Sequence, residues 1–270
     1  MTKQPLNQDR NFDDLAQRFK KNIYGGLKGD IRLAVLNRDF SQYIPVAPFA
    51  PGAAERPLRI LDAGGGQGQF SLQFARAGHH LVICDISKEM LKLAEEVVQR
   101  DSLQERVSLL QCAIQELPSY LPCGDEGFDL VLCHAVIEWM TEPQTLLPCL
   151  LSYLKPAGYL SFTYYNLNSL IYKNLLRTNF KKIIQQDFSG ERGSLTPINP
   201  MPPATIDGWL AGLALEVLNR SGIRVFHDYI FDGANREREP ENVIALELEY
   251  SQREPFLSLG RYIHILAIKH

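Results

Sequence analysis

The stretch LRILDAGGGQGQF, residues 58–70, most constrains how this chain of 270 residues can fold. An apolar run ends in Asp62, four glycines follow between residues 64 and 68, and helical spacing of apolar residues begins at Phe70. The pattern predicts a buried parallel strand that turns sharply into a helix, with glycine where a side chain would strain the turn or hold a ligand away. Several classes of cofactor-binding enzyme share such a turn, which can also be purely structural. Asp62 favours a cationic ligand, because its carboxylate would repel a pyrophosphate but accept hydrogen bonds from an amino group.

The composition is that of an ordinary soluble globular protein, with 45% hydrophobic and 22% charged residues. No apolar run approaches the length of a membrane span, and the polar residues 1–10 do not resemble a signal peptide, so we expect a cytoplasmic protein. The five cysteines are odd in number and lack Cys-x-x-Cys spacing. This pattern indicates neither a disulfide framework nor a metal site.

The charges are distributed unevenly along the chain. Residues 1–57 carry nine Lys/Arg and six Asp/Glu, and residues 165–200 carry five and two, so each segment has a net charge of +3. Residues 58–164 carry seven and thirteen, a net charge of −6, and residues 201–270 carry seven and ten, a net charge of −3. An anionic macromolecule would therefore meet the two basic segments, although either segment can equally be a solvated charged surface.

Hydrophobic periodicity predicts helices and strands that alternate along the chain, as in an α/β fold. We expect strands at residues 58–62, 80–85, 107–111, 128–134, 159–164, 223–229 and 259–265. We expect helices at residues 11–23, 28–43, 70–77, 146–154, 207–220 and 240–250. These elements divide the chain into an amino-terminal helical cap and linker, residues 1–57, and a core domain, residues 58–270, with a basic insertion at about 166–203. The cap helices precede the first strand and are available as a lid.

Two polar residues stand where predicted parallel strands end, at the edge of the sheet where ligands bind in such folds. Asp85 lies seventeen residues after Gly68, a separation suited to binding both hydroxyls of a ribose, although it can also cap the following helix, as Ser87 can. His134 ends the strand at 128–134 and is a candidate ligand contact, with a buried structural histidine as the alternative.

The segment LDAGGGQG resembles the first motif of class I methyltransferases, which use S-adenosylmethionine. The terminal segments NFDDLAQRF, NIYGGLKGDIR, CHAVIEW, YYN, GIRVFHDY and LGRYIH resemble the bacterial tRNA 5-carboxymethoxyuridine methyltransferases, which esterify the carboxylate of a modified wobble uridine. The resemblance implies a Rossmann-like, seven-stranded, mostly parallel sheet with an antiparallel strand, helices on both faces and an amino-terminal helical lid. It also implies that S-adenosyl-L-methionine contacts Arg32, Gly64, Gly65, Asp85, Ile114, Gln115 and His134.

The implied chemistry requires no catalytic residue and no metal. A carboxylic acid with a pKa of about 4 is ionised at neutral pH, so its oxygen can attack the sulfonium methyl without a general base. Groups that orient this carboxylate are still needed, and the candidates are Tyr24, Arg224, His227, Arg261 and Tyr262. Each candidate also has a structural alternative. Arg224 and Arg261 can be solvated strand residues, and Tyr262 can be a core residue. The candidates for contacts with the RNA backbone are Lys173, Arg177, Lys181 and Lys182.

The expected partner is therefore the anticodon stem-loop of tRNA, whose splayed bases and phosphates suit aromatic and basic side chains. Two other functions remain open on the sequence. One is an O-methyltransferase of small carboxylates or phenols with the same fold. The other is a regulator that binds S-adenosylmethionine without chemistry.

Overall fold

The computed structural model describes residues 9–13, 25–45, 48, 56–121, 127–188 and 197–270. Most of the helix expected at residues 11–23, and the candidate Tyr24, lie outside these residues. Among the helices of the described ranges, none is long and apolar enough to cross a membrane.

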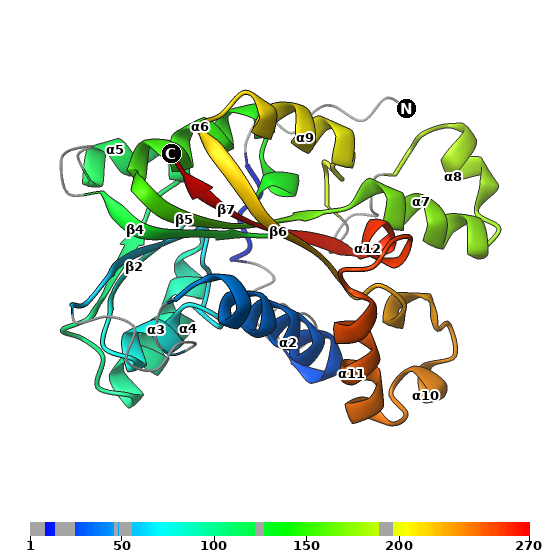
Figure 1. Cartoon of the computed structure of the whole chain (residues 1–270), viewed down its shortest axis with the longest axis horizontal. Helices are drawn as coiled ribbons and strands as arrows, with labels where there is room; N and C mark the ends of the chain where they lie inside the picture. Colours follow the sequence, from blue (N-terminus) through cyan, green and yellow to red (C-terminus); the bar gives the residue numbers. More distant parts are fainter. Residues whose placement is uncertain (1–8, 14–24, 46–47, 49–55, 122–126, 189–196) are drawn as a thin grey trace.

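A seven-stranded sheet forms the centre of the molecule (Figure 1). Its strands are β1 (Arg59–Ala63), β2 (His80–Asp85), β3 (Val107–Gln111), β4 (Phe128–His134), β5 (Leu154–Tyr165), β6 (Leu215–Ile223) and β7 (Tyr262–Lys269), in the order β3-β2-β1-β4-β5-β7-β6. β7 runs antiparallel to both of its neighbours, and the other pairs are parallel. The expected Rossmann-like, mostly parallel sheet with one antiparallel strand is confirmed.

One face of the sheet is covered by α2 (Gly26–Tyr43), α3 (Leu72–Arg76), α4 (Lys88–Arg100) and α11 (Pro240–Tyr250). α2 presents Ile31, Val35 and Phe40 inward at helical spacing, and all three are fully buried. It packs against α11 and β6, and its apolar residues share one core with α3 and β1. α2 is therefore an integral part of this helix layer. The division between a cap of residues 1–57 and a core domain stays a prediction.

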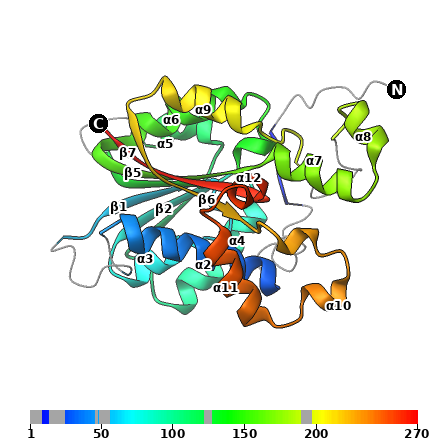
Figure 2. The same ribbon diagram turned by 45° about the vertical axis from the view of Figure 1, so that its right-hand side comes forward.

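The opposite face is covered by α5 (Leu117–Tyr120), α6 (Leu146–Tyr153) and α9 (Pro203–Ala211) (Figures 1 and 2). Short 3-10 turns, η2 (Ile114–Glu116), η3 (Ile137–Trp139) and η4 (Pro143–Thr145), follow β3 and β4 on this side. Leu146, Leu147 and Leu150 of α6 are buried against β4 and β5. Both faces of the sheet thus carry a separate apolar core, which explains the continuous apolar runs of the central strands.

The basic insertion forms two helices that extend from one end of the sheet, α7 (Leu167–Leu176) and α8 (Phe180–Ile184). The remaining carboxy-terminal elements are the turn η5 (His227–Tyr229) and the helices α10 (Gly233–Arg236) and α12 (Phe256–Leu259). Figure 2 places α10 and α12 on the same side of the molecule as α7 and α8.

The expected helix at 207–220 and the expected strand at 223–229 are wrong. The helix ends at its C-cap Gly212, and residues 215–223 form β6, an edge strand paired with β7. Arg224 then adopts a left-handed conformation, φ 60°, and the chain turns into η5. The buried Glu247 carboxylate holds this turn, because it accepts the backbone N–H groups of Val225 and His227 at 2.7 and 2.8 Å. The final strand also starts later than expected, at Tyr262.

Candidate functional site

A pocket opens where β1, β2 and β4 end, at the edge of the sheet predicted to bind ligand. Its walls come from the glycine turn, from segments after β2, β3 and β4, from α2 and from the amino-terminal residues. The residues that line it are Asp9, Arg10, Phe12, Arg32, Gly64, Gly66, Asp85, Ile86, Met90, Cys112, Ile114, Gln115, His134, Ala135, Val136, Trp139, Met140 and Tyr262.

The glycine turn forms the floor of this pocket. Gly64 has φ 71°, a left-handed conformation, and a Cβ on it would collide with the side chain of Val136. A Cβ on Gly65 would collide with the carboxyl group of Asp62, which is 5% exposed. Asp62 therefore lies beneath the turn and does not line the pocket wall. Burial raises the pKa of Asp62 to about 6, and the negative charge of Asp85 adds to this.

Asp85 carries two hydrogen bonds from the backbone and still faces the pocket. Its Oδ2 accepts from Gly66 N at 2.9 Å and its Oδ1 accepts from Ser87 N at 2.8 Å. A carboxylate can accept about four hydrogen bonds, so capacity remains for a ligand. Burial raises the pKa of Asp85 to about 6. Ser87 caps α4 by accepting from Met90 N at 3.2 Å, so the cap role is filled by Ser87 and not by Asp85.

Two further predicted residues face the pocket from opposite sides. Arg32 reaches it from α2 and donates to Gln69 Oε1 at 3.0 Å. His134 lies at the end of β4, half-buried, with its Nε2 2.7 Å from Ser161 Oγ. Burial lowers the pKa of His134 well below 6.5, so this imidazole is neutral. The pocket thus combines a cation, a neutral imidazole and a carboxylate.

Residues 9–13 close one side of the pocket. The sequence offered the helix expected at 11–23 as a lid, but none of residues 9–13 was predicted as a site residue. Asp9 accepts hydrogen bonds from Gln115 Nε2 at 2.9 Å and from Thr141 N at 2.8 Å. The ring of Phe12 packs edge-on against Trp139, with the ring centroids 4.8 Å apart. Of the two residues predicted to contact the adenine, Ile114 is buried and lines the pocket, whereas Gln115 lines it but is exposed and donates to Asp9.

Tyr262 separates the pocket from a buried cluster of charges. Arg261 Nε donates to Asp228 Oδ2 at 2.7 Å, and its NH1 donates to Tyr165 OH at 3.0 Å. Arg224 lies 3.5 Å from the same Asp228 oxygen, and its guanidinium is 5.4 Å from the Tyr262 ring centroid. Both arginines are less than 9% exposed, so neither is a solvated strand residue. Burial alone would raise the pKa of Asp228, but Arg224, His227 and Arg261 lower it well below its usual range.

Two lysines extend this cluster towards the insertion. Burial and the positive charge of Arg261 lower the pKa of Lys173, on α7, to about 8. Burial also lowers the pKa of Lys28, which lies within electrostatic range of Asp228 and was not predicted as a site residue. Cations around a single buried carboxylate give this cluster, formed by Lys28, Lys173, Arg224, Asp228 and Arg261, a net positive charge. We refer to it below as the cationic cluster.

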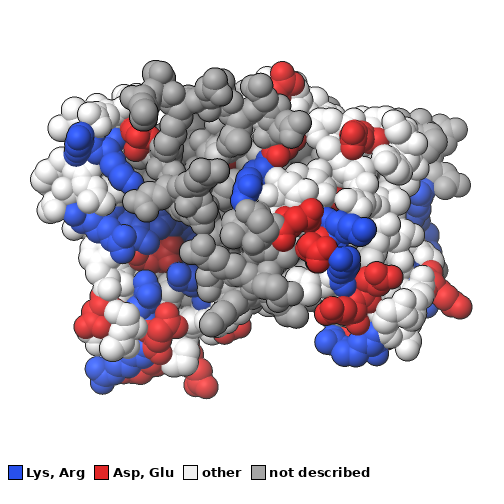
Figure 3. Space-filling model, turned by 180° about the vertical axis from the view of Figure 1, so that it is seen from behind, with Lys and Arg blue, Asp and Glu red and all other residues white. Residues whose placement is uncertain are grey.

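The other predicted residues are less well placed. His227 is fully buried in η5 and does not line the pocket, so the structure does not bring it to a ligand there. Arg177 lies over the ring of Phe231, 5.0 Å from its centroid. Lys181 and Lys182 are exposed on α8. Lys and Arg side chains gather on the left of Figure 3, the side of α7 and α8 in that view.

No group of three or more His, Cys, Asp or Glu side chains within the described ranges is arranged to hold a metal ion. The cysteines Cys84, Cys112, Cys133 and Cys149 are free thiols in or beside the sheet.

Known proteins match this chain along its whole length. The family described as "Methyltransferase domain" matches residues 61–162. The chain is 36% identical over 262 residues to tRNA 5-carboxymethoxyuridine methyltransferase from Escherichia coli (strain K12), covering 97% of each chain. It is 31% identical over 113 residues to malonyl-[acyl-carrier protein] O-methyltransferase from Halalkalibacterium halodurans, covering 41% of this chain and 40% of that one.

The fold is also similar to that of a solved methyltransferase. It is similar to the crystal structure of magnesium protoporphyrin IX methyltransferase from Synechocystis PCC 6803 with bound SAH, with a TM-score of 0.58, 18% identity and 96% of each chain covered. The chain thus has the fold of a methyltransferase and is similar in sequence to methyltransferases. Since more than a third of its residues are identical to one relative across nearly all of both chains, it belongs to the family of the tRNA 5-carboxymethoxyuridine methyltransferases.

Proposed function

We propose that this protein methylates tRNA in the cytoplasm, on the carboxylate of 5-carboxymethoxyuridine at the wobble position. The observation that carries this proposal is the 36% identity to the Escherichia coli enzyme of that name over 97% of both chains. The product would be a methyl ester. The shared length includes the amino-terminal segment and the insertion, which a core methyltransferase fold does not need.

The pocket is suited to S-adenosylmethionine in shape and in chemistry. Gly64 lies on the floor in a left-handed conformation with the side chain of Val136 packed against it, so no side chain fits at this position. We propose that Asp85 accepts the ribose hydroxyls, that Ile114 packs on the adenine with Gln115 near its edge, and that Arg32 pairs with the methionine carboxylate. His134 would line the methionine end, above the turn of Gly64 and Gly65. When bound, S-adenosylmethionine supplies an electrophilic methyl group on a sulfonium.

The task of the protein is then to position the substrate and exclude water. The substrate carboxylate is ionised at neutral pH, so no side chain has to remove a proton. Arg224 and Tyr262 are the best-placed groups to orient this carboxylate, because Tyr262 lines the pocket and Arg224 stacks on its ring. Burial raises the pKa of Tyr262 above its ordinary value, so its hydroxyl stays a hydrogen-bond donor. Arg261, held by Asp228 and Tyr165, would keep this corner of the pocket positive.

We propose that the basic insertion binds the backbone of the anticodon stem-loop. Lys173 connects it to the cationic cluster, and Arg177, Lys181 and Lys182 lie further along α7 and α8. Neutralising phosphates with such side chains gives affinity without sequence preference, while the wobble base would enter beside Tyr262. Exposed aromatic side chains on the same arm, Tyr172 at 38% and Phe180 at 53%, are available for stacking on bases.

The test is methyl transfer to tRNA from a bacterial strain that lacks this protein. The purified protein and S-adenosylmethionine should convert 5-carboxymethoxyuridine to its methyl ester, detected by nucleoside mass spectrometry after digestion. Free small carboxylic acids and phenols serve as competing substrates in the same assay. The proposal is refuted if tRNA gains no methyl ester, or if the small acids are methylated as efficiently as the tRNA.

A matched pair of variants tests the orienting role of the cationic cluster. Arg224→Lys keeps the charge but loses the planar guanidinium that stacks on Tyr262, whereas Arg224→Gln loses the charge as well. We expect the Gln variant to lower kcat/KM for tRNA at least tenfold while S-adenosylmethionine affinity stays within about twofold, since one charge-assisted hydrogen bond contributes about 1.5–3 kcal/mol. Equal loss of cofactor affinity would contradict this assignment.

A further inference from the structure

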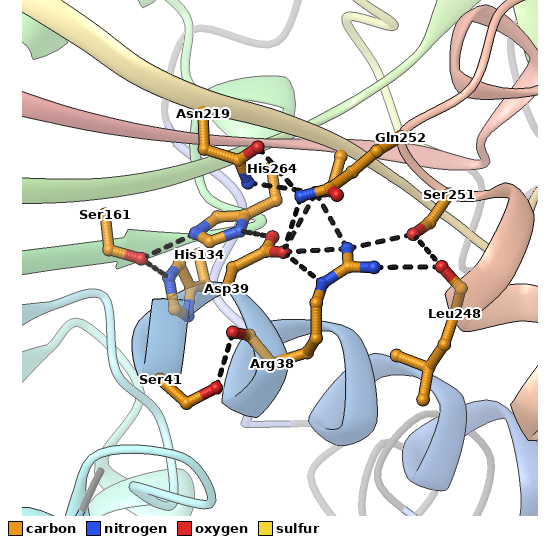
Figure 4. Close-up of polar contacts among 11 residues, drawn as sticks. Arg38, Asp39, Ser41, His134, Ser161, Asn219, Leu248, Ser251, Gln252 and His264 are labelled. Carbon is orange, nitrogen blue, oxygen red and sulfur yellow. Dashed lines mark hydrogen bonds and ion pairs between the residues drawn. The ribbon is translucent and has the colours of Figure 1, made fainter. Parts of the chain in front are cut away.

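Four side chains form a continuous hydrogen-bonded chain from the core of the protein to the wall of the pocket (Figure 4). Asp39 Oδ2 lies 2.7 Å from His264 Nδ1, and His264 Nε2 lies 2.9 Å from Ser161 Oγ. The same Ser161 oxygen lies 2.7 Å from His134 Nε2, and His134 lines the pocket. The chain joins α2, β7, β5 and β4, so a group seven residues after Arg32 on α2 reaches the ligand site through three intermediaries.

The Asp39 carboxylate is an acceptor on both of its oxygens. Its Oδ1 accepts from Arg38 Nε at 2.7 Å and from Ser221 Oγ at 3.0 Å, and its Oδ2 faces His264. Asp39 and His264 are both 0% exposed. The arginine already balances the carboxylate, so a second cation on His264 would leave an uncompensated buried charge, which is costly. With a single proton, His264 carries it on Nδ1, because the Asp39 carboxylate that faces this nitrogen can only accept.

The tautomer of His264 determines which group donates at each later step of the hydrogen-bonded chain. With its proton on Nδ1, His264 has a bare Nε2 that must accept, and Ser161 supplies its only hydroxyl proton to it. The Ser161 oxygen can then only accept, so His134 must donate from Nε2–H. Since the His134 imidazole is neutral, its Nδ1 keeps a lone pair. This nitrogen points away from Ser161 in Figure 4 and makes no hydrogen bond to the described residues.

We propose that Asp39, His264 and Ser161 are positioning residues that hold His134 in the Nε2–H tautomer, so that Nδ1 presents a hydrogen-bond acceptor to the cationic methionine end of S-adenosylmethionine. The proposal rests on the function proposed above, which puts that end of the cofactor between Arg32 and His134. An acceptor at this point favours the ammonium group, whereas an N–H there would oppose it. The tautomer is thus determined by a carboxylate that never touches the ligand.

The first test is nitrogen NMR of the full-length protein labelled with 15N-histidine, with resonances assigned by single histidine replacements. Long-range proton–nitrogen correlations distinguish the two tautomers and the imidazolium ion. We expect a proton on Nδ1 of His264 and on Nε2 of His134 in the ligand-free protein at neutral pH. A proton on Nδ1 of His134, or a doubly protonated His264, overturns the proposal. The measurement involves no cofactor, so it does not depend on the proposed function.

The second test uses one isosteric substitution to exchange the donor and acceptor roles along this hydrogen-bonded chain. In Asp39→Asn the oxygen must still face Arg38 and Ser221, which are donors, so the new NH2 group faces His264 Nδ1 and makes it an acceptor. The proton of His264 then moves to Nε2, Ser161 donates to His134 instead of accepting from it, and His134 becomes the Nδ1–H tautomer. This is the logic by which an amide in place of a buried carboxylate fixes the wrong tautomer of a catalytic histidine.

Calorimetry of this variant should show S-adenosylmethionine binding about tenfold weaker, the effect of losing one hydrogen bond to a charged group. The matched control is Gln252→Ala, which removes a hydrogen bond of 3.4 Å to the same carboxylate and one of 2.9 Å to Asn219 without reversing any donor in the chain. It should keep both the tautomer and the affinity of the wild type. If Asp39→Asn does not fold, Ser161→Ala severs the chain in the middle and should lose the single-tautomer signature of His134.

An inverted tautomer with unchanged affinity refutes the role in binding. An affinity loss in Asp39→Asn without a tautomer change also refutes the proposal, because it would indicate a merely structural effect. If the wild-type protein has the expected tautomer but produces no heat with S-adenosylmethionine, the proposed function fails and the positioning role fails with it.

Discussion

Glu138 provides the most direct test of how the core beside the pocket is built. Its side chain is fully buried in η3, and neither carboxyl oxygen has a hydrogen-bond partner within the described residues. Burial raises its pKa from an ordinary 4.5 to about 8. The backbone amides of Glu138 and Tyr165 favour the ionised form, but too weakly to offset this burial. At neutral pH the group is therefore an un-ionised acid.

The perturbation is Glu138→Gln, which keeps the shape of the side chain and removes its titratable carboxyl group. Below pH 4.5 the carboxyl is protonated in both the folded and the unfolded chain. Between pH 4.5 and about 8 the unfolded chain releases a proton that the folded chain keeps, so stability falls with pH by about 1.4 kcal/mol per unit. The total reaches about 3 kcal/mol at pH 7 and about 4 kcal/mol at pH 8, where half of the folded molecules are also ionised. The glutamine variant should escape this loss, although its buried amide costs about 1–3 kcal/mol at every pH.

The assay is urea unfolding of both proteins at intervals from pH 5 to pH 8, with the difference in unfolding free energy plotted against pH. Taking the difference cancels all groups that the two proteins share. The variant should gain about 1.4 kcal/mol per pH unit relative to the wild type over most of this range. Glu142→Gln, an exposed glutamate four residues further on, is the control and should give a flat difference. A flat difference for Glu138→Gln as well would show that the carboxyl ionises in place, and the reasoning would be wrong.

Three further predictions concern ligands. Asp85→Ala should weaken S-adenosylmethionine binding by about 1–3 kcal/mol in calorimetry, and wild-type affinity should fall as pH drops through about 6, where Asp85 gains a proton; equal affinity at pH 5 and 7.5 contradicts this. Affinity for tRNA should fall as pH rises through about 8, where Lys173 loses its charge, and Lys173→Arg should abolish that dependence in filter binding. Lys181→Ala with Lys182→Ala should reduce the slope of log affinity against log salt by about 1.5, whereas Lys92→Ala on α4 should leave it unchanged.

The four strands of the amino-terminal half of the sheet could be predicted to within one residue, since β1 was expected at 58–62 and spans Arg59–Ala63. β2, β3 and β4 have the predicted bounds, because each is a short run rich in apolar residues between clear turn signals. The site residues at their ends follow from the same rule, since parallel strands bring Asp85 and His134 to one edge of the sheet.

The errors fall where packing between distant segments overrides the local pattern. The helix predicted at 207–220 covers most of β6, whose inward residues Asn219 and Ser221 are polar. Their partners are Gln252 and Arg38, far away in sequence. The pocket wall formed by Asp9 had no local signal either, because Asp9 meets Thr141, 132 residues further along the chain. Periodicity reports which residues are apolar, and it cannot reveal a polar face that is satisfied by a remote partner.

The position of α2 has a consequence for shortened forms of this protein. A truncated protein that begins at β1 would keep all seven strands of the sheet. It would also expose the apolar surface that Val35 and Phe40 cover, and it would strip His264 and Ser221 of the acceptor that holds them. We therefore expect such a fragment to aggregate, and we expect the helix to fold together with the sheet it precedes.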